Sequence, residues 1–321
     1  VPLPYSYVYS CSSATTASLA LPQLDSHSYL IPQHSIMHEE EEVRAFSCRI
    51  DNVKTITDIL NCLCIDPAKG QHCHVEATPD SLFFIVTGRA KATQARVGLQ
   101  QDLFEEYVCP SESVKFAINL TILIDCLHIF GSSSETTTAT MTYSSSDAVF
   151  RISLEENGVI TTCDVTSLYS EDADEIQQGL FTAFRENPEE CQIIIKSDPL
   201  RECVQELTEA LWAGSVQVQV SDRPLNLKLS TGGSIGMSEI NLPRSSDVFI
   251  SFRCNHPVTF QYPLKSLVLG MKALSVSKET YIRINAEGIM CVQHQIETAK
   301  GDETFFDFLM VAEEKFEGEE G

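Results

Sequence analysis

Four segments of the chain carry a single apolar stripe with the spacing of an α-helix. They begin at Asn52, Asn119, Pro199 and Pro263, and the residues one, four and eight positions after each start are apolar. Asn is a favoured N-cap and Pro a favoured first helical residue, with Asp198 as the expected cap of the third segment. The pattern predicts four amphipathic helices, each with one face on a core and the other in water. The stripes are Val53, Ile56, Leu60; Leu120, Leu123, Leu127; Leu200, Cys203, Leu207; and Leu264, Leu267, Met271.

Strand-like runs flank each predicted helix. A short apolar run precedes each of them, at 44–50, 113–118, 192–196 and 258–262. Alternating runs follow, as where Val216, Val218 and Val220 interleave with polar residues. Such alternation is typical of antiparallel strands with one buried face. The predicted unit is therefore one strand, one helix and about three further strands, and the chain holds four of these units.

The spacing of the helix starts groups the units into two pairs. Asn52 and Asn119 are 67 residues apart, Pro199 and Pro263 are 64 apart, and the two pairs are offset by 147 and 144 residues. This predicts two domains, at 43–166 and 191–312, joined by an interdomain linker at 167–190. Outside them we expect a disordered N-terminal extension at 1–42, rich in Ser, Pro and Tyr, and an acidic tail at 313–321.

Composition narrows the class of protein. Apolar residues make up 43% and charged residues 21% of the chain, as in ordinary globular proteins. The 45 acidic residues against 22 Lys and Arg give a formal charge of −23, which argues against coating nucleic acid by bulk charge. Twelve cysteines without a Cys-x-x-Cys pattern indicate reduced thiols. No apolar run approaches the roughly 20 residues of a membrane span, so no membrane partner is expected.

The pattern of four units in two domains resembles the sliding clamps of the proliferating cell nuclear antigen (PCNA-like) superfamily. The segment Phe116–Gly131, FAINLTILIDCLHIFG, is similar to the second-helix segment of the Rad-one family, the "one" subunit of the nine-one-one checkpoint heterotrimer. Segments 155–163 and 227–236 agree with the same family, and the resemblance covers about 43–312. It implies an α+β DNA clamp fold of two domains, each of two β-α-β-β-β units, with helices on the inner face and antiparallel sheets outside.

The resemblance also implies a function and a set of partners. It implies a non-catalytic subunit, without cofactor or metal, that forms a heterotrimeric ring with two paralogous clamp subunits. Double-stranded DNA would pass through the ring, and a clamp loader of the replication-factor-C type would place the ring at damaged DNA. Repair and checkpoint client proteins would then dock on it, in the nucleus.

The wet faces of the predicted helices would point at DNA in such a ring. Their basic residues are Lys54, Arg201, Lys265 and Lys272, whereas the second helix offers only His128. So few cations predict weak, salt-sensitive DNA binding, which suffices where ring topology prevents dissociation. The alternative is that these are ordinary solvated helix charges.

Closing a ring requires open sheet edges. The resemblance places them at 159–165, with Val159, Ile160 and Val165, and at 236–242, with Gly236, Ile240 and Leu242. The alternative is that both runs are interior strands of a monomeric sheet.

The linker contains an apolar group, Leu180, Phe181 and Phe184, which we expect to pin it to the domain beneath. These residues would border the groove where partner peptides dock in this superfamily. The alternative is that the linker is itself a clamp-binding peptide, because Gln177, Leu180, Ala183 and Phe184 nearly match that pattern.

Two other functions rival that of a heterotrimeric clamp subunit. A 3'-5' DNA exonuclease needs carboxylates that converge on two metal ions, and no Asp-x-Glu pair stands at the end of an apolar strand. A homotrimeric replication processivity clamp is the second rival.

Asn119 heads a glycosylation-like triplet but is expected to cap a helix. One group of potential metal ligands is close in sequence, but its spacing turns the side chains apart: Cys62, Cys64, His72, Cys73 and His74.

Overall fold

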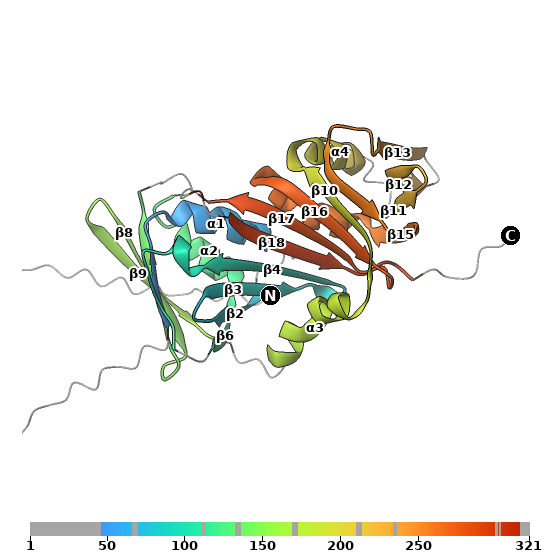
Figure 1. Ribbon diagram of the computed structural model, residues 1–321. Coiled ribbons are helices and arrows are strands. Elements are labelled where there is room, and N and C mark those ends of the chain that lie inside the picture. Colours follow the sequence, from blue (N-terminus) through green and yellow to red (C-terminus); the bar gives the residue numbers. More distant parts are fainter. Residues whose placement is uncertain are drawn as a thin grey trace, which may run out of the picture. The chain divides into compact units, whose positions relative to one another are not determined.

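The chain repeats one order of elements, strand, helix and three strands, four times (Figure 1). The structure is a computed structural model that describes residues 46–65, 70–110, 113–131, 136–168, 173–209, 214–233, 236–298, 301 and 303–314. All of these residues belong to one unit that begins at Glu41. The predicted N-terminal extension at 1–42 and the acidic tail beyond Glu314 lie outside the described residues.

The first two repeats together have ten strands and helices in the predicted order, with one added strand, β5. The first repeat is β1 (Phe46–Ile50), α1 (Val53–Cys62), β2 (His72–Ala77), β3 (Ser81–Thr87) and β4 (Thr93–Gln100), followed by β5 (Glu106–Val108). The second repeat is β6 (Val114–Asn119), α2 (Leu120–Leu127), β7 (Thr138–Ser144), β8 (Val149–Glu156) and β9 (Val159–Thr166).

The last two repeats follow the same order after a further helix, α3 (Ala173–Glu186). The third repeat is β10 (Glu189–Lys196), α4 (Ser197–Glu209), β11 (Ser215–Asp222), β12 (Leu225–Gly233) and β13 (Gly236–Pro243), followed by β14 (Phe249–Cys254). The fourth repeat is β15 (Val258–Pro263), α5 (Leu264–Gly270), the 3-10 helix η3 (Lys272–Ser275), β16 (Ser277–Asn285), β17 (Met290–Glu297) and β18 (Glu303–Met310). Two short 3-10 turns, Arg89–Lys91 and Gln101–Leu103, flank β4.

The strands form three sheets, and every neighbouring pair is antiparallel. The first sheet has the order β5-β1-β7-β8-β9, and the third has the order β13-β12-β11-β15. The second sheet has nine strands in the order β14-β10-β16-β17-β18-β4-β3-β2-β6. We call it the shared sheet, because both halves of the chain contribute strands to it. The halves meet where β4 pairs with β18, from Thr93 opposite Met310 to Gly98 opposite Phe305. The predicted α+β class with antiparallel sheets is confirmed.

The apolar stripes of the four helices are buried, as their spacing predicted. Eleven of the twelve stripe residues are buried, and the exception is Cys203, next to which Val204 takes the core position. Three helices begin directly after Asn52, Asn119 and Pro263. The prediction for α4 was wrong by two residues, because this helix begins at the buried Ser197 instead of Pro199.

The two asparagine caps differ. The side-chain oxygen Oδ1 of Asn119 accepts hydrogen bonds from the N–H groups of Thr121 and Ile122, at 3.0 and 3.2 Å. This is the bonding expected of an N-cap, which satisfies amide donors that have no partner within the helix. Asn52 occupies the same position before α1, but its buried Oδ1 has no hydrogen-bond partner among the described residues.

The helices of the four repeats contact one another in a continuous series. α1 packs against α2 and also against η3, and η3 packs against α4 and α5. One hydrogen bond joins the two halves within this series, from Lys272 Nζ to the carbonyl oxygen of Cys64. The sliding-clamp interpretation required neighbouring helices, and the structure meets that requirement.

The two faces of the shared sheet carry different helices. Phe308 on β18 lies against Gly270 of α5, where an added Cβ would come within 2.7 Å of the ring. The next residue along, Leu309, clusters instead with Phe181 and Phe184 of α3. Because successive side chains of a strand point to opposite faces, α5 and α3 lie on opposite faces of this sheet.

A buried histidine ties α5 to the shared sheet. His294 on β17 is fully buried, and its Nε2 donates to the carbonyl oxygen of Gly270 at 2.8 Å. Its Nδ1 then accepts from the hydroxyl of Thr280 at 3.0 Å, so the imidazole is held neutral. Burial lowers the pKa of His294 to about 4.

We predict a stability loss on acidification that depends on His294. An unfolded histidine takes up a proton near pH 6.5, whereas the folded one stays neutral down to about pH 4, so stability falls as the pH drops through this window. The loss should reach about 2 kcal/mol by pH 5, measured by urea unfolding at pH 7 and pH 5. His294→Gln can keep the bond to Gly270 without titrating and should remove this part of the loss. Equal losses in both proteins would assign the acid sensitivity to other groups.

Candidate functional site: sheet edges, helix face and linker

The strand β9 ends the first sheet and pairs only with β8. Two apolar side chains at its start face solvent, Val159 at 56% and Ile160 at 68% exposure. Val165, grouped with them in the prediction, is different because its side chain is buried in the core and only its backbone lies at the edge. β9 is therefore an open edge with an apolar start.

The strand β13 ends the third sheet and pairs only with β12. Gly236 is exposed, while Ile240 and Leu242 are half-buried against the core. The most exposed apolar side chain here is Met237, at 73%, which the sequence prediction missed. Each of the two predicted edge strands thus has a neighbour on one side only among the described residues, and neither is an interior strand of this chain.

Cross-strand ion pairs order both edges. On the first sheet, Arg151 holds Asp164 through two bonds of 2.7 and 3.0 Å, and this hydrogen bonding lowers the pKa of the Asp164 carboxyl. On the third sheet, Lys228 Nζ lies 2.6 Å from Glu239 and lowers the pKa of that carboxyl in the same way. Exposed pairs add little stability, but they neutralise the only acidic residue on each edge strand.

The four predicted DNA-facing cations differ in their surroundings. Lys54 pairs with Asp58 at 2.8 Å, and Arg201 pairs with Asp198 at 2.8 Å. Lys265 is exposed on α5, and Lys272 is engaged with the Cys64 carbonyl. Helix α2 exposes Ile122 and has no Lys or Arg, and Ile129, just beyond its end, is also exposed. The contact of these residues with DNA stays a prediction.

The linker residues lie in the helix α3, which the sequence prediction did not include. Phe181 and Phe184 are buried against Cys291 and Leu309, and Leu180 packs beside them. α3 is irregular at Gly179, where the backbone leaves helical geometry (φ −17°, ψ −127°). The side chain of Gln177 lies outside the described residues, so the clamp-binding-peptide alternative is described only at Leu180, Ala183 and Phe184.

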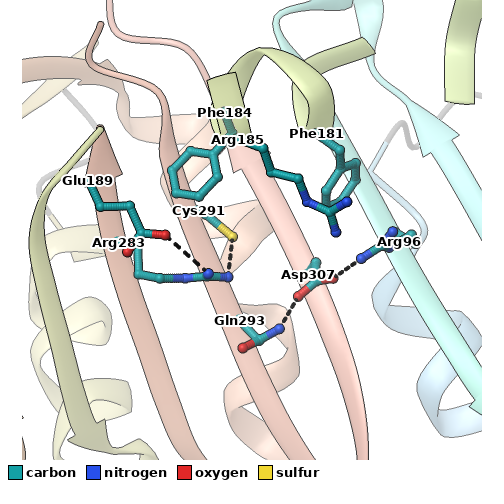
Figure 2. Close-up of a pocket in the computed structure, with 9 residues that line it drawn as sticks. All are labelled: Arg96, Phe181, Phe184, Arg185, Glu189, Arg283, Cys291, Gln293 and Asp307. Atoms are coloured by element: carbon teal, nitrogen blue, oxygen red, sulfur yellow. Dashed lines mark hydrogen bonds and ion pairs between the residues drawn. The ribbon is translucent and has the colours of Figure 1, made fainter. Parts of the chain in front are cut away.

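Two arginines of the shared sheet stack on the α3 rings (Figure 2). The guanidinium of Arg96, on β4, lies 4.3 Å from the centre of the Phe181 ring, and that of Arg283, on β16, lies 5.4 Å from the Phe184 ring. Cation–π contacts of this kind contribute about 0.5–2 kcal/mol each. The sequence held no local signal for them, because the partners come together only through sheet pairing.

The potential metal ligands close in sequence, Cys62, Cys64, His72, Cys73 and His74, lie around the start of β2 and the end of α1. On β2, His72 is exposed while the adjacent Cys73 is fully buried, as alternation along a strand requires. Within the described ranges, no group of three or more His, Cys, Asp or Glu side chains could hold a metal ion. Across the same ranges, no helix is long and apolar enough to cross a bilayer.

The repeated units, the helix series and the two open edges define a fold, that of the PCNA-like clamps. A solved structure with this fold, the PCNA2–PCNA3 complex from Sulfolobus tokodaii, superimposes with a TM-score of 0.66 over 83% of this chain and 98% of that chain. Sequence identity is 14%, so this likeness concerns the fold.

Sequence comparison identifies the family. The family model described as "Repair protein Rad1/Rec1/Rad17" matches residues 45–296. The "Cell cycle checkpoint protein RAD1" of Mus musculus is 32% identical over 280 residues, covering 86% of this chain and 95% of that protein, and the Homo sapiens protein of the same name is 30% identical over 282 residues, covering 87% and 95%. The "DNA damage checkpoint control protein rad1" of Schizosaccharomyces pombe is 24% identical over 271 residues, covering 77% and 81%. The chain belongs to the Rad1 family, which confirms the resemblance noted in the sequence.

We predict that Phe184→Ala releases α3 from the shared sheet. Truncating a buried Phe lowers the free energy that holds the helix in place by about 3 kcal/mol. This corresponds to roughly a hundredfold more frequent local opening. Hydrogen exchange of the amides at 180–186 measures this opening. Phe305→Ala, on the exposed part of β18, is the matched control and should leave α3 protected. Unchanged exchange in Phe184→Ala would show that other contacts hold the helix.

Proposed function

We propose that this chain is a non-catalytic subunit of a heterotrimeric sliding clamp that is loaded at damaged DNA and acts in checkpoint signalling and repair in the nucleus. Membership of the Rad1 family supports the checkpoint role, since the relatives are named for cell cycle and DNA damage checkpoints. The clamp fold supports the mode of action.

The observation that carries this proposal is the pair of open edges. β9 and β13 end different sheets, and each exposes large apolar side chains, Val159 and Ile160 on one and Met237 on the other. An unpaired strand edge with apolar side chains is an aggregation liability unless another strand adds to it. Pairing of one edge with a different edge of a neighbour is a heterologous contact, and such contacts form a ring when the rotation between subunits closes.

We assign the two clamp domains to 43–166 and 191–312, with 167–190 as the linker. Each domain would then contribute one of the two edges, β9 from the first and β13 from the second. The pairing of β4 with β18 would hold the two domains in a fixed relation inside one subunit. The edge residues proposed to meet the neighbours are Val159, Ile160, Val165, Gly236, Met237, Ile240 and Leu242.

Two paralogous clamp subunits are the proposed neighbours, and a homotrimer is the rival. Double-stranded DNA would face the helix series, with Lys54, Arg201, Lys265 and Lys272 as weak phosphate contacts. A formal charge of −23 would keep DNA from the rest of the surface. A clamp loader of the replication-factor-C type and repair or checkpoint clients complete the proposed partners.

We predict that Ile160→Asp and Met237→Asp each block assembly without unfolding the chain. A carboxylate buried in a strand-addition interface without a partner costs about 3 kcal/mol or more, so each edge should bind at least a hundredfold more weakly. Light scattering on a column separates the products when the chain is mixed with its two paralogues. Ile129→Asp places the same charge at an exposed Ile two residues beyond the end of α2 and is the control. A stable trimer of this chain alone would contradict the proposal.

We also expect no nuclease activity that belongs to this chain. The measurement is release of nucleotides from labelled single- and double-stranded DNA in magnesium, with purified protein. Phosphodiester cleavage by this chain would depend steeply on each metal-binding carboxylate. Trace activity from a contaminating enzyme should therefore be unaffected by single substitutions of Asp or Glu in this chain. Activity that copurifies with the chain and disappears on one such substitution would replace the proposal with the exonuclease alternative.

A further inference from the structure

A pocket of about 200 Å³ lies between α3 and the face of the shared sheet that α3 covers (Figure 2). The whole chain has a formal charge of −23, yet the pocket has three cationic groups against two anionic ones. The pocket is therefore a locally cationic site in a strongly acidic protein. Its charged lining is Arg96, Arg185, Arg283, Glu189 and Asp307.

The carboxylate of Asp307 is already satisfied. Its Oδ2 accepts from Arg96 at 2.9 Å and its Oδ1 accepts from Gln293 at 2.6 Å, while the side chain is only 7% exposed. Both oxygens thus have short bonds to neighbours in the shared sheet. This acid neutralises Arg96 and has little capacity left for a second cation.

The guanidinium of Arg283 is, by contrast, poorly satisfied. Its Nη1 reaches Glu189 at 3.4 Å, at the long end for a hydrogen bond, and the partner of its Nη2 among the described residues is the sulfur of Cys291, also at 3.4 Å. Burial raises the pKa of the Cys291 thiol to about 12, so the sulfur is neutral and a weak acceptor. The third donor, Nε, is buried without a hydrogen-bond partner in the described part of the chain.

Arg185 adds a second guanidinium with donors to spare. It stands in the last turn of α3 and is exposed, and Figure 2 shows its side chain extending from the helix over the pocket. Over the residues that the structure describes, it has neither an ion pair nor a hydrogen bond to its side chain. The pocket therefore has N–H donors to spare and a net positive charge.

The aromatic rings of α3 fix two of the guanidinium groups. Phe181 lies 4.3 Å from the Arg96 carbon Cζ, and Phe184 lies 5.4 Å from that of Arg283. Stacking restricts each long side chain to one orientation, so less conformational entropy is lost when a ligand binds.

We propose that this pocket binds a phosphate monoester, carried on a phosphorylated side chain of a partner protein. Guanidinium groups match phosphate oxygens through paired N–H bonds. A phosphate monoester has about two negative charges, so it gains more from the excess positive charge of the pocket than a carboxylate does. Three phosphate oxygens also suit the unmatched donors of Arg283 and Arg185. The exclusion of DNA phosphodiesters as the ligand rests on the proposed function, because that function places DNA on the opposite face of the shared sheet.

The test is titration of the full-length, unassembled chain at constant ionic strength with O-phospho-L-serine, inorganic phosphate or acetate. Calorimetry gives the affinities, and arginine-selective nitrogen NMR reports the Arg283 Nε–H. Phosphoserine should bind saturably at one site, shift that resonance, and bind at least about tenfold more tightly than acetate. Arg185→Gln should lower the affinity for phosphoserine about tenfold, and Arg185→Lys should lower it less.

Arg223→Gln is the matched control, since Arg223 is 92% exposed and is not among the pocket residues. It should bind phosphoserine as the unaltered chain does. Absence of saturation, equal affinity for acetate, binding of inorganic phosphate but not of phosphoserine, or unchanged affinity in Arg185→Gln would each overturn the proposal. Because the chain is tested without partners, these results do not depend on whether it forms a ring.

Discussion

The pairing of β4 with β18 is the interaction on which the rest of the structure depends. It joins strands from the two halves of the chain into one sheet, over residues 93–98 and 305–310. The ion pair between Arg96 and Asp307 and the bond from Thr304 to the Gly98 carbonyl, at 2.7 Å, fasten this junction from both sides. Gly98 allows the ring of Phe83 on the next strand to lie close to the backbone, because an added Cβ would come within 2.5 Å of that ring and force it to shift.

This junction also determines where the helices, the pocket and the open edges lie. With β4 and β18 paired, one face of the shared sheet receives α5 and the other receives α3. The same register brings Arg96 opposite Asp307, and β17 adds Gln293, so the pocket under α3 exists only when both halves are joined. β9 and β13 remain as terminal strands of the other two sheets, where a neighbouring subunit can add to them.

Much of this fold could be predicted from the sequence, because it rests on local periodicity. Stripes such as Leu120, Leu123 and Leu127 identify a helix and its buried face without reference to any other part of the chain. Four repetitions of that pattern, flanked by alternating runs, were enough to predict the α+β class. The error at Ser197 has a different cause, because this small polar residue gives no helical signal and is buried by a tertiary contact with Thr280.

The parts that could not be predicted depend on contacts between distant segments. The spacing of Phe181 and Phe184 was visible, but the arginines that stack on them come from β4 and β16. Met237 escaped prediction because a lone Met has no periodic context, and its exposure follows from the sheet order. Val165 was grouped with its exposed neighbours, although alternation along β9 turns its side chain into the core.

The central claim is that this chain joins others through its open edges to enclose DNA, and topology tests it most directly. The complex of the chain with its two paralogues, loaded by a replication-factor-C type loader, is isolated on closed circular DNA in high salt. The DNA is then cut once. The account predicts that the complex stays on the circle and is released by the cut, because weak contacts alone do not survive high salt. Release from the uncut circle, or retention on the cut DNA, would contradict it.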